Sequence, residues 1–168
     1  MSIATRLKSF LDEQKVCYTL MTHSPAYTAQ AAAATLHVPG KEVAKTVVVR
    51  AGDQTLLAIL PASCHVNWKK LAAVVGRDVR LATEQEFINL FSDCELGAMP
   101  PFGQLYSLPV FVDQALAADE EIVFNAGTHR DAIRMRYADF VALEKPRVAS
   151  FADTAGAARR STTRTRQP

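Results

Sequence analysis

Residues 43–50 (VAKTVVVR) constrain the fold of this chain more than any other segment. Side chains alternate between the two faces of a β-strand, so one face carries Val43, Lys45, Val47 and Val49, and the other carries Ala44, Thr46, Val48 and Arg50. Both faces are mostly apolar, which predicts an internal strand of a sheet. An ammonium in such a strand must reach water, pair with another group, or line a ligand cavity.

The rest of the chain predicts short helices and strands without a regular βαβ repeat. Apolar periodicity and capping residues predict helices over residues 3–13, 28–36, 67–75, 84–91 and 137–143. Strands are predicted over residues 16–21, 43–50, 55–60, 110–112, 122–125 and 132–135. This arrangement favours a single-domain α+β fold with a mixed, mostly antiparallel β-sheet surrounded by helices.

Length and charge set the domain boundaries. The 168 residues suit one domain, which we place at residues 1–152, followed by a basic disordered tail over residues 153–168. That tail carries four arginines, Arg159, Arg160, Arg164 and Arg166. The whole chain has 19 basic and 17 acidic residues, so without these four the rest has 15 basic and 17 acidic residues and is slightly acidic. A tail of this kind either binds phosphate backbones loosely or only adds solubility.

The composition also indicates where the protein works. The sequence has no apolar run of the length that a membrane helix needs and no secretory signal, so we expect a cytoplasmic protein that does not contact membranes. Three widely spaced cysteines (Cys17, Cys64, Cys94) predict reduced thiols, and the four histidines lack metal-ligand spacing. We therefore expect no metal and no cofactor.

Two further segments are predicted to be loops around a cavity near Lys45. Gly97–Gly103 (GAMPPFG) combines flexible glycines with Pro100 and Pro101, which fix φ and remove two amide donors. We expect a stiff loop whose remaining amides can point at a ligand oxygen and, with Lys45, stabilise an oxyanion. The second segment, residues 124–129 (FNAGTH), places Thr128 and His129 in a turn beside Gly127. A single histidine in a turn is more often solvated than catalytic, and no acidic partner is evident for it.

Taken together, these segments resemble the YbaK/ProX family of aminoacyl-tRNA deacylases, which are freestanding relatives of the prolyl-tRNA synthetase editing insertion. The shared pattern is an alanine-rich helix (residues 29–36), a Lys-Thr-hydrophobic strand (Lys45-Thr46-Val47), the Gly97–Gly103 loop and the Gly127-Thr128-His129 turn. Order and separation match over residues 6–143.

The resemblance implies hydrolysis of the ester that joins a wrong, small amino acid to the terminal ribose of a tRNA, such as tRNA(Pro). Lys45 would match the essential lysine, which positions the terminal adenosine and the ester. The substrate pocket would be bordered by the two loops, through Gly97, Met99, Pro100, Pro101, Phe102, Gly103, Gly127, Thr128 and His129. Recognition would centre on the acceptor end of the tRNA, with a synthetase or an elongation factor as a presenting partner.

Two other functions remain open. The chain could be a non-catalytic module that binds tRNA or an aminoacyl ligand on the same fold, because a fold does not fix a function. It could also be a thiol hydrolase that uses Cys64 or Cys94. The adjacent residues Ser63, Cys64 and His65 give no triad geometry, and a lysine on an apolar face favours the deacylase.

Overall fold

The computed structural model describes residues 4–154. Its helices are α1 (Thr5–Glu13), α2 (Ala29–Leu36), α3 (Trp68–Val75), α4 (Glu84–Phe87), α5 (Gln114–Ala117), α6 (Tyr137–Glu144) and a 3-10 turn, η1 (Gly103–Tyr106). Its strands are β1 (Tyr18–Thr22), β2 (Ala44–Ala51), β3 (Gln54–Pro61), β4 (Cys64–Val66), β5 (Arg80–Leu81), β6 (Val110–Asp113), β7 (Glu121–Asn125), β8 (Asp131–Arg136), β9 (Arg147–Ala149) and β10 (Ala152–Thr154). Within this range no helix has the length and apolarity needed to cross a bilayer.

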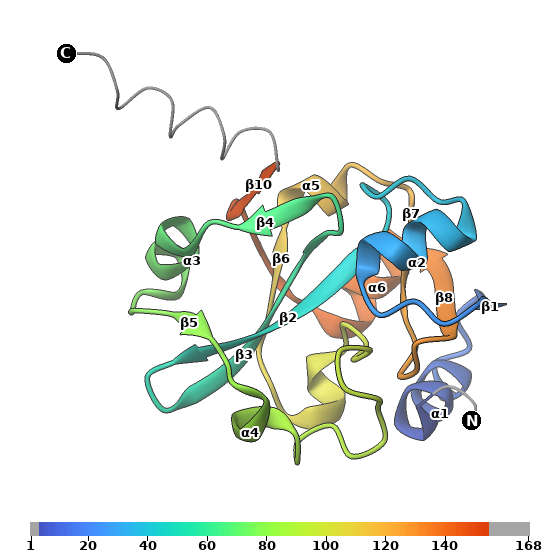
Figure 1. The fold of residues 1–168 in the computed structure, drawn as a ribbon, viewed down its shortest axis with the longest axis horizontal. Helices are drawn as coiled ribbons and strands as arrows, with labels where there is room; N and C mark the ends of the chain where they lie inside the picture. The colour runs from blue at the N-terminus through green and yellow to red at the C-terminus, as the bar shows by residue number, and fades with distance from the viewer. Residues whose placement is uncertain (1–3, 155–168) are drawn as a thin grey trace.

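The largest sheet is built on the long β2–β3 hairpin (Figure 1). Its strand order is β5-β2-β3-β6-β9, with antiparallel pairs on either side of β2 and parallel pairs from β3 through β6 to β9. A three-stranded antiparallel sheet, β1-β8-β7, and a two-stranded one, β10-β4, complete the strands. The predicted α+β class is confirmed, although the strands form three sheets rather than one.

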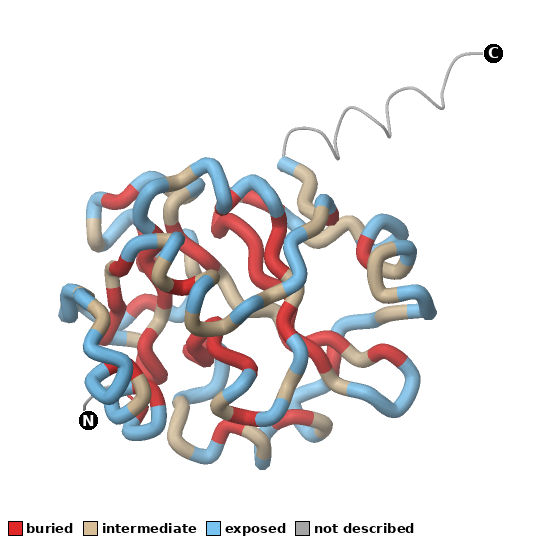
Figure 2. The backbone as a smooth tube through the Cα atoms, turned by 180° about the vertical axis from the view of Figure 1, so that it is seen from behind, coloured by how far each residue is buried: buried red, intermediate tan, exposed pale blue. Residues whose placement is uncertain are grey.

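Both faces of the hairpin are buried, as predicted for an internal strand. Ala44, Val48, Leu57 and Ile59 pack into one cluster, under α1 and the Gly97–Gly103 loop. Val49, Leu56, Ala58 and Leu60 face the other way, into a cluster closed by α3 and Phe151. Figure 2 shows the buried segments gathered in the inner strands, with the connecting loops mostly exposed. The N-terminal end of β2 meets β7 through a parallel bridge between Val43 and Val123.

Most of the predicted elements are present, with bounds that differ by one or two residues. The predicted caps of α2 and α4 are present: the Thr28 side chain accepts from the Ala31 amide at 3.0 Å, and Thr83 forms a capping box with Glu86. The helix predicted over residues 84–91 is shorter, because regular helix ends at Phe87 and turns follow. Phe87 and Phe91 are nevertheless both buried, with ring centroids 6.3 Å apart.

The C-terminal part of the described chain is attached more firmly than predicted. β10 extends to Thr154, two residues into the segment expected to be a disordered tail; residues 155–168 lie outside the described residues. The buried carboxylate of Asp113 organises this end. Its Oδ1 accepts hydrogen bonds from the amides of Phe151 and Ala152, both at 2.8 Å, and its Oδ2 accepts from the Ala115 amide at 2.9 Å.

We expect Asp113→Ala to lower the free energy of unfolding by about 1–3 kcal/mol, because three backbone amides lose their acceptor. The Phe151 amide is buried, and the amides of Ala152 and Ala115 are partly buried. Urea denaturation followed by circular dichroism measures the change. Asp113→Asn keeps one accepting oxygen and should lose less. An Asp113→Ala protein as stable as the parent would show that these hydrogen bonds do not hold β10 in place.

Candidate functional site

Lys45 lies in β2, opposite Leu60 of β3, with its side chain half-buried. Its ammonium donates a hydrogen bond to the backbone carbonyl of Cys64, at the start of β4. Burial lowers the pKa of the Lys45 ammonium, and its electrostatic interaction with Cys64 opposes part of that shift. The cation therefore lies where little water solvates it, with a fixed orientation.

A pocket of about 140 Å³ opens beside the Lys45 side chain. It is lined by Thr28, Ala29, Gln30, Lys45, Ala62 and His65. These residues come from the N-terminal end of α2, from β2, from the connection between β3 and β4 (Ala62) and from β4 (His65). The sequence analysis identified Lys45 but not the polar lining residues Gln30 and His65. In the sequence, Gln30 follows the predicted N-terminal cap of a helix and His65 follows Cys64, and neither pattern indicates a pocket.

The two glycine loops meet each other, as expected, but in a different place from this pocket. The Glu95 amide donates to the Gly127 carbonyl at 2.7 Å, and the Gly127 amide donates to the Ala98 carbonyl at 3.0 Å. A Cβ on Gly97 would contact the His129 ring at 3.5 Å. Neither loop contributes a wall of the Lys45 pocket.

The Gly127–His129 turn is joined to the pocket through the chain that precedes α2. The Ala26 amide donates to the His129 carbonyl at 3.0 Å, and the ring of Tyr27 lies 4.9 Å from the His129 ring between centroids. Thr28, the next residue, lines the Lys45 pocket. The turn therefore contacts the segment that lines the pocket but does not line the pocket itself.

Gly127 is required by the fold as much as by the site. Its φ of +99° favours glycine, and a Cβ there would lie 2.7 Å from the Cβ of Ala4. The same stretch receives the start of α1, since the Ala4 amide donates to the Ala126 carbonyl at 2.8 Å. The turn therefore packs directly under the N-terminal helix.

Thr128 and His129 have structural partners that limit what they can do. The buried hydroxyl of Thr128 donates to Asp131 Oδ2 at 2.7 Å and accepts from the Asp131 amide at 2.9 Å, so it does not face a substrate. His129 Nε2 lies 2.7 Å from the Leu96 carbonyl, which assigns the proton of a neutral ring to Nε2. The other nitrogen, Nδ1, is buried. In this arrangement His129 positions the loop and is not placed as a general base.

Most of the Gly97–Gly103 loop is core rather than pocket surface. The Phe102 ring is fully buried among Phe10, Phe124 and Phe140, with centroids 5.2 to 5.8 Å away, so its expected contact with a substrate is corrected. Pro100, Pro101 and Gly103 are buried beside it, and a Cβ on Gly103 would lie 2.4 Å from the Leu108 carbonyl oxygen. Only Gly97, with a φ of +85°, is exposed.

Met99 lies on the opposite side of β2 from the Lys45 pocket. It is buried, and it helps to line a separate, mostly apolar pocket of about 290 Å³. The other walls are Thr46, Val47, Val48, Leu81, Ala82, Glu84 and Phe87. The expectation that Met99 shapes the cavity beside Lys45 therefore has no support in this geometry.

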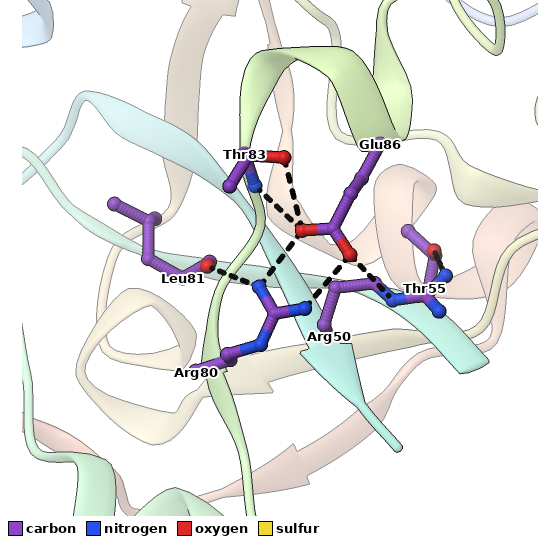
Figure 3. A network of polar contacts seen from close by, with 6 residues as sticks. All are labelled: Arg50, Thr55, Arg80, Leu81, Thr83 and Glu86. Carbon is purple, nitrogen blue, oxygen red and sulfur yellow. Dashed lines mark hydrogen bonds and ion pairs between the residues drawn. The ribbon is translucent and has the colours of Figure 1, made fainter. Parts of the chain in front are cut away.

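Residues from segment 81–84 form one side of that second pocket, and an ionic network lies next to them (Figure 3). Arg80 Nη1 and Nη2 each donate to a Glu86 carboxylate oxygen at 2.8 Å, and Arg50 Nε lies 3.2 Å from Glu86 Oε2. The hydrogen bonds from Arg80 and from the Thr83 amide lower the pKa of Glu86 to about 2. The network ties α4 and β5 to β2.

The cysteines do not form a nucleophilic site. All three thiols are free. Burial raises the pKa of the Cys94 thiol to about 12, so at neutral pH it stays protonated, 3.2 Å from the Tyr106 hydroxyl. Cys64 is buried, and its polar contribution to the site is its backbone carbonyl.

Glu144 holds the end of the Gly97–Gly103 loop from the last turn of α6. Its two carboxylate oxygens accept hydrogen bonds from the backbone amide and the side-chain amide of Gln104, both at 3.1 Å. Burial raises the pKa of Glu144 to about 7, although these hydrogen bonds favour the charged form.

Residues 23–143 match a protein-family model described as an aminoacyl-tRNA editing domain. Over 156 residues the chain is 27% identical to a protein of Escherichia coli (strain K12) named multifunctional Ser/Thr-tRNA deacylase ProXp-y, and this match covers 89% of the chain and 93% of that protein. A proline–tRNA ligase of Thiobacillus denitrificans (strain ATCC 25259 / T1) is 33% identical over 101 residues, which are 59% of the chain and 17% of the ligase.

A solved structure shares the fold. The crystal structure of a candidate trans-editing enzyme for prolyl tRNA synthetase superposes with a TM-score of 0.77 at 24% identity, covering 89% of the chain and 96% of the other protein. At this level of identity the likeness supports the fold alone, and it agrees with the α+β class derived above.

We expect the free energy of unfolding to fall as the pH rises from about 4.5 to about 7, because the raised pKa of Glu144 means that the folded protein holds this proton more tightly than the unfolded chain. Glu144→Gln mimics the protonated carboxyl and should remove this dependence. Thermal unfolding at pH 5 and pH 8 should show the variant gaining about 2–4 °C on the parent at the higher pH. An identical pH dependence in both proteins would contradict the role of Glu144.

Proposed function

Because the chain belongs to the aminoacyl-tRNA editing domain family, we propose that it hydrolyses mischarged aminoacyl-tRNA in trans and that Lys45 lies at its reaction centre. The enzyme class expected from the sequence, an aminoacyl-tRNA deacylase, is confirmed by the matched family and by the deacylase relative. The assignment of individual residues and of the substrate is the proposal.

The observation that carries the proposal is the half-buried Lys45 ammonium, oriented by the Cys64 carbonyl at the wall of a small pocket. An aminoacyl ester reacts when a water oxygen attacks its carbonyl carbon. The carbon–oxygen bond to the ribose then breaks, and the proton that the attacking water loses is transferred, directly or through solvent, to the released ribose oxygen. Negative charge develops on the carbonyl oxygen during the attack, and a poorly solvated cation stabilises it more strongly than water does.

The N-terminal end of α2 adds to this effect. Thr28, Ala29 and Gln30 line the pocket, and the first amides of a helix have no acceptor within the helix. The positive end of the helix dipole thus lies on the same pocket as Lys45. The sequence had assigned this task to amides of the Gly97–Gly103 loop, whereas the geometry supports α2 for it.

We further propose that the aminoacyl group is small. The pocket measures about 140 Å³, and Gln30 and His65 in its lining offer hydrogen-bonding partners to a small polar side chain. The deacylase relative is named for serine and threonine, and the synthetase match makes tRNA(Pro) a candidate tRNA. Recognition would involve the acceptor end, presented freely or by a synthetase or elongation factor.

A non-catalytic binding module is the competing function, and it predicts affinity for aminoacyl-tRNA without turnover. The thiol hydrolase has less support, since the pKa of Cys94 is about 12 and the Cys64 thiol is buried. A panel of tRNAs carrying alanine, cysteine, serine or threonine, on tRNA(Pro) and on their own tRNAs, separates turnover from binding.

On the best substrate of that panel, Lys45→Met should lower kcat/KM by about 100- to 1,000-fold, the usual effect of losing one group that stabilises an oxyanion. Methionine keeps the apolar stem without the charge, so the fold should remain, as circular dichroism and thermal unfolding check. Lys69→Met, an exposed lysine of α3, is the matched control and should leave kcat/KM unchanged. Full activity in a folded Lys45→Met protein would refute the proposed mechanism.

Cys64→Ala and Cys94→Ser should keep kcat/KM within about three-fold of the parent, because neither thiol is placed to act as a nucleophile. Cys64→Ala leaves the backbone carbonyl that orients Lys45. Loss of turnover in either variant, at unchanged thermal stability, would restore the thiol hydrolase as the better assignment.

A further inference from the structure

Tyr27 is the most exposed large hydrophobic side chain in the described part of the chain. Its exposed fraction is 73%, although it lies between two structured segments, the end of β1 and the start of α2. Single exposed aromatic rings are common on protein surfaces, so the surroundings of this ring decide whether it has a role.

One side of the Tyr27 ring is supported from within the protein. The His129 ring lies 4.9 Å away between centroids, at an interplanar angle of 52°. His129 is itself held at three atoms: its Nε2 is 2.7 Å from the Leu96 carbonyl, its amide donates to Glu95 Oε2 at 3.0 Å, and its carbonyl accepts from the Ala26 amide at 3.0 Å. The support is rigid, so the exposed face of Tyr27 is presented with little loss of conformational entropy on binding.

Tyr27 also adjoins the Lys45 pocket along the chain. Tyr27 directly precedes Thr28, Ala29 and Gln30, all of which line that pocket, and consecutive Cα atoms are about 3.8 Å apart. A nucleoside ester that reaches Lys45 with its carbonyl group has its base one ribose away. Tyr27, directly before the pocket-lining Thr28, is an exposed aromatic residue on which such a base could stack.

We infer that Tyr27, supported by His129, is a stacking platform for the 3′-terminal adenine of the tRNA substrate. This inference rests on the proposed function, since it names the part of the same substrate that the site holds outside the aminoacyl pocket. Stacking requires an aromatic face but not the tyrosine hydroxyl. Because every base has a π-face, stacking would distinguish a tRNA end, which carries a base, from a simple amino acid ester, which carries none.

The test compares Tyr27→Leu with Tyr27→Phe. Leucine keeps apolar bulk without a π-face, whereas phenylalanine keeps the π-face without the hydroxyl. Affinity is measured by fluorescence anisotropy with an uncharged acceptor-stem RNA that ends in CCA, and with the same RNA lacking its last base. Because this RNA is not hydrolysed, the binding measurement does not depend on the deacylase activity.

Tyr27→Leu should weaken binding of the CCA-ended RNA by about 5- to 150-fold, the range measured for loss of one stacked base. Tyr27→Phe should bind like the parent, and all three proteins should bind the RNA without the last base equally weakly. In deacylation, Tyr27→Leu should raise KM and leave kcat unchanged.

Trp68→Leu is the matched control, since Trp68 is a partly exposed aromatic of α3 that lines no part of the Lys45 pocket. It should leave both RNA affinities unchanged. Parent-like binding of the CCA-ended RNA by Tyr27→Leu would overturn the inference. An equal loss of affinity of Tyr27→Leu for the RNA without its last base would also overturn it, because Tyr27 would then contact the RNA elsewhere than at the terminal base. If the parent binds the RNA through Tyr27 but deacylates no aminoacyl-tRNA, the proposed function fails and the stacking platform stands.

Discussion

Burial of the β2–β3 hairpin on both faces is the constraint on which the rest of the structure depends. β2 has neighbours on both edges and apolar clusters above and below, so the Lys45 side chain is half-buried, and its strand offers it no carboxylate. The protein satisfies it with a backbone carbonyl from β4 and leaves it facing a pocket. A register shift of one residue would exchange Lys45 with Thr46 and place the cation in the Met99 pocket.

The sequence predicted those elements that depend on local information. The β2–β3 hairpin follows from two apolar runs around Gly52, α2 from its alanine-rich run after Thr28, and α3 from its apolar stripe. β5 and β10 could not be predicted in this way. They are two or three residues long, and they become strands because β2 and β4 offer free edges to them. The buried Asp113 carboxylate, 38 residues before Phe151, aligns β10 through the tertiary structure alone.

A site residue could be predicted where its charge is unusual for its apolar surroundings. Prediction was less successful where the residues of a motif also serve to build the fold. Lys45 belongs to the first kind. Phe102 and Thr128 belong to the second, since one fills the aromatic core and the other closes a turn on Asp131. Gln30 and His65 carry no local pattern that separates them from ordinary surface residues, and only the packing of α2 against β2 and β4 makes them neighbours of Lys45.

The close contact between Gly127 and Ala4 has a consequence for the motions of the site. The start of α1 packs against the turn with no room for a Cβ on Gly127, and the Ala4 amide bonds to the Ala126 carbonyl, so a movement of the turn disturbs the docked helix. α1 is held by Leu7 and Leu11, both without exposed surface, so its undocking exposes buried apolar area. We therefore expect the helix and the turn to form one cooperative unit in hydrogen exchange, in which the amides of Ala4 and Gly127 become exchangeable together. The timescale on which His129 leaves its place behind Tyr27 would then be set by the undocking of α1, a helix that lines no part of the Lys45 pocket.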